Sequence, residues 1–197
     1  MKHKINTTFK EWITIAPHTA FQMQEFSRPY SVGKRREKWW KRAKPVLVPN
    51  DLWGISMSQL IDLSELEDGE NGFYKVCNVL LGLTVDEVNK ARAVDVVKLC
   101  GWVYTEVKKI NEIFSNIPKP DLTNDEQMAG FGEKDDNGLF NMLDWYARRM
   151  GIQDQDDAAK VGWSKIYAAI KKDNEDAIKQ RRLIEIQNRN NNKIKRS

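Results

Sequence analysis

Acidic residues between positions 133 and 157 are the part of this chain whose types and spacing come nearest to a chemical site. Glu133 and Asp144 stand at the first and last positions of a calcium-loop spacing, with Asp, Asn and Gly between them. The match is incomplete, because such loops begin with Asp and end with a Glu that binds through both oxygens. Asp156 and Asp157 lie in a polar stretch, which does not tune a carboxylate for acid–base catalysis. We interpret these residues as helix-start charges and expect no metal site.

Histidine and cysteine usage points away from the other common chemistries. His3 and His18 are the only histidines, and neither lies near Cys77 or Cys100 in sequence, so the usual zinc spacings are not met. The chain has no P-loop, dinucleotide-binding glycine pattern or nucleophile elbow. Both cysteines fall on apolar helical stripes, and we expect them to be buried thiols. The sequence therefore predicts a protein that is not an enzyme and has no cofactor.

Basic residues are concentrated in two stretches of a chain whose net charge is only +4. Eight basic residues lie within Arg28–Lys44 against Glu37 alone, and seven lie within Lys179–Ser197 against Glu185 alone. The rest of the chain is acidic in sum. Segregated charge of this kind is typical of proteins that bind nucleic acid or an acidic protein.

The first basic stretch is predicted to form a short helix from Lys34 to the residue before Pro45. Trp39 and Trp40 would project about 100° apart on it, and we expect one ring to be buried and the other exposed. Three roles stay open: a surface helix docked on its own core, a nucleic-acid contact and an anchor for a partner protein. The candidate partner-binding residues are Arg35, Arg36, Lys38, Trp39, Trp40, Lys41 and Arg42.

The elements around this stretch predict a mainly α fold, with at most one short strand pair near Val46 to Leu52. Capping-box spacing predicts helix starts at Ser56 and Thr84, and Gly82 and Gly151 are placed to end helices in the left-handed conformation. Apolar residues at helical spacing predict helices over Phe73–Leu80, Val96–Phe114, Leu139–Met150 and from Trp163 to Ile184, with a short helix after Asp154. Phe9 to Ile15 are too few to distinguish a strand from a helix.

These boundaries predict a compact multi-helix domain with basic extremities. Its expected parts are an N-terminal segment with the basic Trp-containing helix over residues 1–51, a central helical core over 52–117, a linker over 118–137, C-terminal helices over 138–188 and a disordered basic tail over 189–197. No repeat at solenoid periods is present. We find neither a signal peptide nor an apolar run long enough to span a bilayer, and we expect no membrane contact and a cytoplasmic location.

Part of this pattern resembles a known family. The run Ile-Ser-Met-Ser-Gln-Leu-Ile-Asp-Leu from Ile55 to Leu63, then an acidic turn, then Val79 to Val88, resembles small helical proteins of tailed bacteriophages. Phe140 to Ile152, followed by Trp163, is similar to the C-terminal helices of phage tail assembly chaperones. The resemblance covers roughly residues 52–184, and the basic tryptophan element lies outside it. It implies a protein without an active site that binds the tape measure protein or tail-tube subunits before assembly.

The leading hypothesis is therefore a phage or prophage morphogenesis factor of the tail assembly chaperone kind, in the host cell cytoplasm. It would offer helical grooves and charged extremities to a helical partner. Two alternatives remain: a nucleic-acid-binding protein that uses the Lys34–Lys44 helix and the Lys179–Arg196 tail, and a structural component of the virion.

Overall fold

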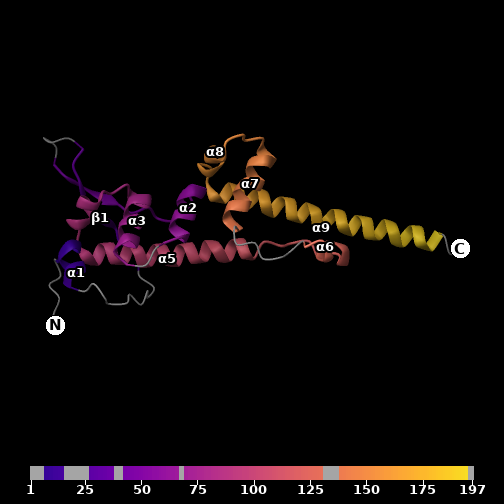
Figure 1. Ribbon diagram of the computed structural model, residues 1–197, viewed down its shortest axis with the longest axis horizontal. Helices are drawn as coiled ribbons and strands as arrows, with labels where there is room; N and C mark the ends of the chain where they lie inside the picture. The colour runs from indigo at the N-terminus through magenta and orange to yellow at the C-terminus, as the bar shows by residue number, and fades with distance from the viewer. Residues whose placement is uncertain (1–6, 16–26, 38–41, 67–68, 131–137, 195–197) are drawn as a thin grey trace. The chain divides into compact units, whose positions relative to one another are not determined.

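The mainly α fold is confirmed by the computed structural model, which describes residues 7–15, 27–37, 42–66, 69–130 and 138–194 (Figure 1). These ranges contain nine helices and one two-stranded sheet. The chain divides into two compact units, residues 1–111 and residues 112–197.

Unit 1 begins with helix α1 (Phe9–Ile15), at a place where the sequence pattern left strand and helix open. The ring of Phe9 is fully buried, with ring centroids 5.4 Å from Phe73 and 5.7 Å from Tyr74. The backbone N–H of Phe9 donates to the carbonyl of Ala91 at 2.9 Å. These contacts fasten α1 to helix α3 (Glu70–Leu81) and to the turn that follows helix α4 (Val85–Asn89).

A β-hairpin stands where a basic helix was expected. Strands β1 (Ser31–Arg35) and β2 (Lys44–Leu47) pair antiparallel, with Lys34 opposite Pro45 and Arg35 opposite Lys44. The prediction of a helix from Lys34 to the residue before Pro45 is therefore wrong at both ends. The expectation of one short strand pair is confirmed, although the pair was expected near Val46 to Leu52.

The physical reason lies in the apolar residues beside the basic ones. Val32 is fully buried and Val48 is 5% exposed, so the hairpin places valines on the core and leaves most of its described basic side chains in solvent. A three-turn helix in water gains too little from its own hydrogen bonds to compete with that burial. Pro45 is compatible with an edge strand, where its missing N–H leaves no partner unsatisfied.

The predicted start and end signals agree with helices α2 (Met57–Ser64), α3 (Glu70–Leu81) and α4 (Val85–Asn89). Ser56 and Thr84 each form a full capping box with the residue three positions on. Gly82 ends α3 with a φ of 60°, which glycine adopts without the strain of a Cβ.

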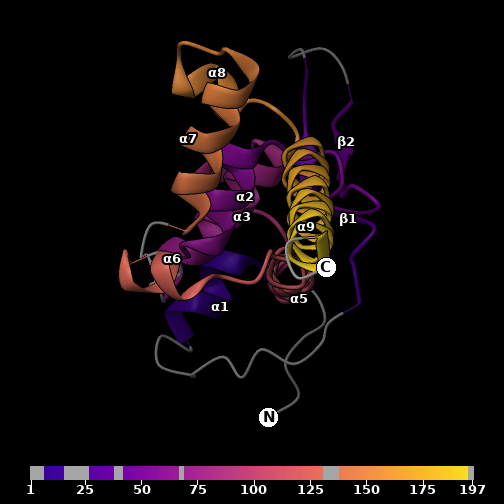
Figure 2. The same ribbon diagram turned by 90° about the vertical axis from the view of Figure 1, so that its right-hand side faces the viewer.

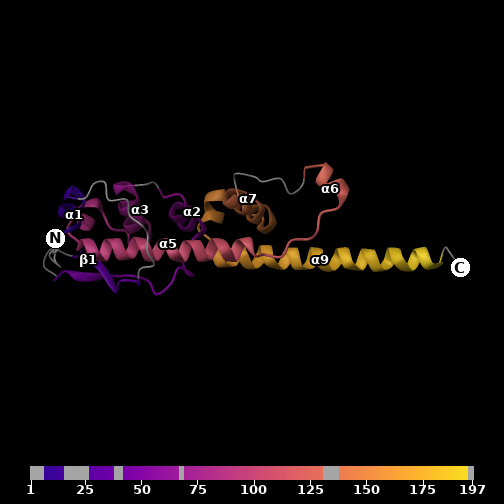
Figure 3. The same cartoon turned by 90° about the horizontal axis from the view of Figure 1, so that it is seen from below.

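Helix α5 (Ala93–Ser115) carries the predicted apolar stripe, whose residues are buried from Val96 to Phe114. The hairpin lies on one side of α5 and helices α2 and α3 on another (Figures 2 and 3). Cys77 and Cys100 are free and buried, as expected. A hydrogen bond with the Cys77 thiol, together with burial, raises the pKa of the Cys100 thiol well above its ordinary value.

Unit 2 contains helices α6 (Asn124–Met128), α7 (Gly138–Met150), α8 (Gln155–Ala159) and α9 (Trp163–Ile194). Two expectations need correction. The linker predicted over 118–137 includes α6, which begins with a capping box between Thr123 and Glu126. The tail predicted as disordered from position 189 is helical through Ile194, because α9 continues without a stop signal.

Both units contain the same module: a helix, a left-handed glycine, a five-residue helix and a long helix. Residues 85–89 of α4 and 155–159 of α8 are seventy positions apart, and each helix closes on a lysine, Lys90 or Lys160, in right-handed α conformation. The buried residue of each short helix, Val88 or Ala158, accepts a backbone hydrogen bond from the residue three positions on, at 2.9 and 3.1 Å respectively. The two modules are therefore structural repeats of one another.

Candidate interaction surfaces

Arg35, a predicted partner-binding residue, is engaged within unit 1. Its guanidinium donates through Nε and Nη2 to the two carboxylate oxygens of Glu87, at 2.9 and 3.1 Å, and through Nη2 to the carbonyl of Gly82 at 2.5 Å. The Arg35 hydrogen bonds, aided by the backbone N–H of Thr84, lower the pKa of Glu87 from 4.5 to about 2. Arg35 thus fixes the hairpin to the turn between α3 and α4.

The other predicted residues of this element are not brought together into a surface that the structure describes. Arg36 and Arg42 are exposed. Lys38, Trp39, Trp40 and Lys41 lie outside the described residues, and so does the expected split between a buried and an exposed tryptophan.

The first part of the partial calcium-loop spacing, residues 133–137, also lies outside the described ranges. Its last residue, Asp144, pairs with Arg148 at 2.8 Å and accepts a hydrogen bond from Gln155 at 3.2 Å. Within the ranges that the structure describes, no group of three or more potential metal ligands comes together.

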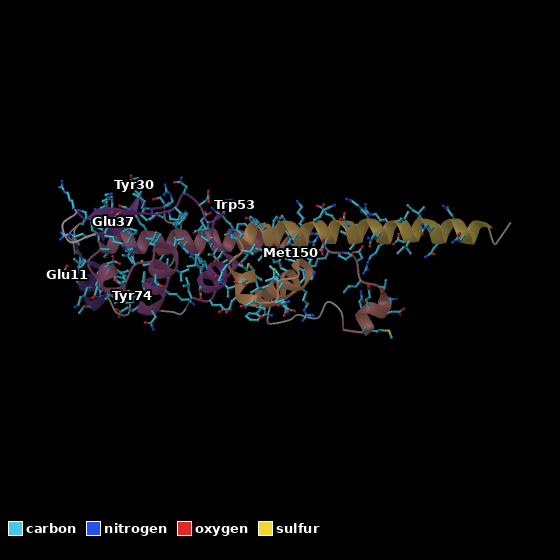
Figure 4. The ribbon with its side chains drawn as sticks, turned by 90° about the horizontal axis from the view of Figure 1, so that it is seen from above. Glu11, Tyr30, Glu37, Trp53, Tyr74 and Met150 are labelled. Atoms are coloured by element: carbon cyan, nitrogen blue, oxygen red, sulfur yellow. The ribbon has the colours of Figure 1, made fainter. Side chains whose placement is uncertain are left out.

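Several large apolar side chains are exposed, and three of them lie close together on α9. Tyr30, Trp53 and Met150 are exposed singly (Figure 4), which is ordinary for protein surfaces. Leu183, Ile184 and Ile186 differ, because they fall within four consecutive positions and are 54%, 55% and 55% exposed. We call these three residues the α9 apolar cluster.

Within the described residues, the side-chain contacts between the rest of unit 2 and α9 end at Arg181, two positions before this cluster. Asp173 holds Arg149 of α7 in a two-bond ion pair, with both distances 2.7 Å. Farther along, Arg181 pairs with Glu126 of α6 at 2.7 Å and donates to the carbonyl of Asp121. From position 182 to 191 every residue is exposed. Figures 1 and 3 show this part of α9 continuing past α7 and α8.

Basic side chains flank the α9 apolar cluster. Residues three or four apart are neighbours on a helix surface, so Arg182 and Arg189 stand on either side of Ile186, and Lys179 stands one turn before Leu183. Lys179 makes only a long contact with Asp176, at 3.6 Å, and its side chain is 68% exposed. The segment therefore presents an apolar arc with positive charge along one edge.

Sequence reasoning included Ile184 in the last helix but did not single out this cluster. Leu183 and Ile186 lie on the side of α9 away from the stripe that begins at Trp163, and that position was the available signal. An amphipathic helix needs one apolar face, so apolar residues outside that face, next to arginines, indicate a second contact surface.

No family model, curated protein or solved structure matches this chain. The described helices also include none with the length and apolar character needed to cross a bilayer. What the geometry defines is a mainly helical protein with an exposed apolar and basic helical segment.

Proposed function

We propose that this chain is a bacteriophage or prophage morphogenesis factor of the tail assembly chaperone kind. It binds a tail protein, the tape measure or a tube subunit, in the host cytoplasm before assembly. The observation that carries the proposal is the α9 segment of residues 182–191, in which every residue is exposed and which contains the α9 apolar cluster. A helix that exposes large aliphatic groups in water is suited to binding another protein.

The sequence resemblance supports the particular kind of binding protein. The residues that carry it, Ile55–Leu63 and Val79–Val88, lie in one continuous part of unit 1 that spans α2, α3, the Gly82 turn and α4. A bond from a side chain to the backbone ties α2 to α3: the side-chain amide of Gln59 donates to the backbone carbonyl of Val79 at 2.9 Å. This part of the chain is thus a scaffold, and the exposed segment of α9 is the part available to a partner.

The gene neighbourhood tests the proposal most directly. A tape-measure gene beside this one supports it, and a position inside a metabolic operon refutes it. Co-expression then gives a biochemical measurement: the soluble fraction of the neighbouring tape-measure protein should rise when this chain is present. If that fraction does not change, the chaperone role is refuted.

A further inference from the structure

We propose that residues 179–190 of α9 bind an acidic amphipathic helix of the partner protein. The partner helix places aliphatic or aromatic side chains on the α9 apolar cluster and carboxylates against Lys179, Arg182 and Arg189. This inference rests on the proposed function, because it specifies the chemistry of the partner.

The internal repeat shows what covers the equivalent position of the first long helix. Seventy positions before Ile184 lies Phe114, a residue in the last turn of α5 and within unit 2 that is only 6% exposed. Its ring centroid lies 5.8 Å from that of Trp163 and 5.6 Å from that of Tyr167, both in the first turns of α9. At this position the long helix of the module thus packs against aromatic side chains in the first turns of another helix. In α9 the same position is 55% exposed.

The charge around the cluster determines which helix fits. Among residues 179–190, the basic side chains are Lys179, Arg181, Arg182 and Arg189, and the acidic one is Glu185. Arg181 is already paired with Glu126. Of the remaining three basic groups, Arg182 and Arg189 lie along one edge of the apolar arc, so a partner needs carboxylates along the matching edge of its own apolar stripe.

A second copy of this chain and a nucleic acid both fit the α9 apolar cluster less well than an acidic helix does. A second copy of this chain would bring the same positive edge against itself, and like charges at an interface oppose association. Nucleic acid would satisfy the basic groups but would leave three aliphatic side chains without a suitable contact, since phosphate contacts dominate such binding.

Binding of synthetic helical peptides to the full chain tests the inference. One peptide of about 20 residues carries Leu and Trp on one face with Glu along its edges, and a matched peptide carries Lys in place of Glu. By fluorescence polarisation, we expect the Glu peptide to bind at least tenfold more tightly than the Lys peptide.

Three variants locate the contact. Leu183→Ser, Ile184→Ser and Ile186→Ser together should weaken binding of the Glu peptide at least tenfold. The matched control changes three scattered exposed residues that are 53%, 85% and 57% exposed, Val85→Ser, Met128→Ser and Phe140→Ser, and should leave binding unchanged. Arg182→Glu with Arg189→Glu should shift the preference from the Glu peptide to the Lys peptide.

Several results would overturn the inference. They are equal binding of the two peptides, equal losses from the cluster variant and its control, tight salt-sensitive binding of duplex DNA with no peptide binding, and a dimer in sedimentation velocity that the cluster variant abolishes. A metabolic gene neighbourhood together with cluster-dependent binding of the Glu peptide would refute the chaperone role and leave the docking site standing. A tape-measure gene beside this one, together with no binding of the Glu peptide, would refute the docking site and leave the chaperone role standing.

Discussion

The ion pair between Arg35 and Glu87 should stabilise unit 1 by a modest and pH-dependent amount. The two side chains are 40% and 26% exposed, so solvent screens the pair and it contributes about 1 kcal/mol. The hydrogen bond from Arg35 to the Gly82 carbonyl adds about 1 kcal/mol. Arg35→Met, which keeps the aliphatic stem, should therefore lower the free energy of unfolding by roughly 1–2 kcal/mol at pH 7.

The sign of the pH dependence follows from Glu87. Its pKa is lowered from 4.5 to about 2 in the folded chain, so its contribution is fully present above about pH 4.5 and is lost as the pH falls towards 2. The difference in unfolding free energy between the wild type and Arg35→Met should shrink over that interval. The hydrogen bond to Gly82 does not titrate there, so part of the difference should persist.

Urea denaturation followed by circular dichroism at pH 7, 4 and 3 measures this difference, and hydrogen exchange of β1 and α4 peptides assigns it to unit 1. Arg92→Met is the matched control, because Arg92 pairs with Asp95 at 2.8 Å within one helical turn. Such a local pair contributes only about 0.2–0.5 kcal/mol. The reasoning is refuted if Arg35→Met costs no more than Arg92→Met, or if its cost is the same at pH 7 and pH 3.

Three further outcomes can be measured on unit 2 and on the thiols. Trp163 is fully buried, so Trp163→Ala should cost about 3–5 kcal/mol in urea denaturation, and a cost below about 1 kcal/mol would contradict its place in the core. Gly151 has a φ of 66°, and a methyl group there would meet open space, so Gly151→Ala should lower the melting temperature through about 1 kcal/mol of backbone strain alone, whereas Gly138→Ala should not lower it. Cys77 and Cys100 are buried, so a disulfide reagent at pH 8 should label them slowly until guanidinium is added, and full labelling within seconds would refute their burial.

The helices could be predicted because their signals are local. Ser56 and Thr84 cap helices through residues three positions away, and Gly82 ends a helix by its own conformation. Helix α6 was missed although the same signal is present, since Thr123 and Glu126 have capping-box spacing. That pair is visible in the sequence, and the prolines nearby favoured a linker instead.

The hairpin could not be predicted because it depends on residues far away in sequence. Lys34 to Lys44 are mostly good helix formers, and only the packing of strands β1 and β2 selects the extended form at the two ends of this stretch. Arg35 reaches Glu87, fifty-two positions on. The α9 apolar cluster was missed for a related reason, because exposure depends on where the neighbouring helices end, and no local pattern records that.

The repeat could not be predicted from the sequence because its two copies share few identical residues, among them Gly82 with Gly151 and Lys90 with Lys160. What they share is backbone geometry and the spacing of buried positions. A chain can keep both while nearly every side chain changes, provided that each core remains filled.

The two modules divide their buried volume in opposite ways, and this has a consequence for assembly. In unit 1 the short helix buries Val88 and the following long helix begins with Ala93, whereas in unit 2 the corresponding residues are Ala158 and Trp163. A chimera that joined α4 to α9 would combine the two larger side chains and overpack the core, and one that joined α8 to α5 would leave a void. Exchange of halves between the modules, a common misfolding route for duplicated segments, is therefore penalised by side-chain size alone.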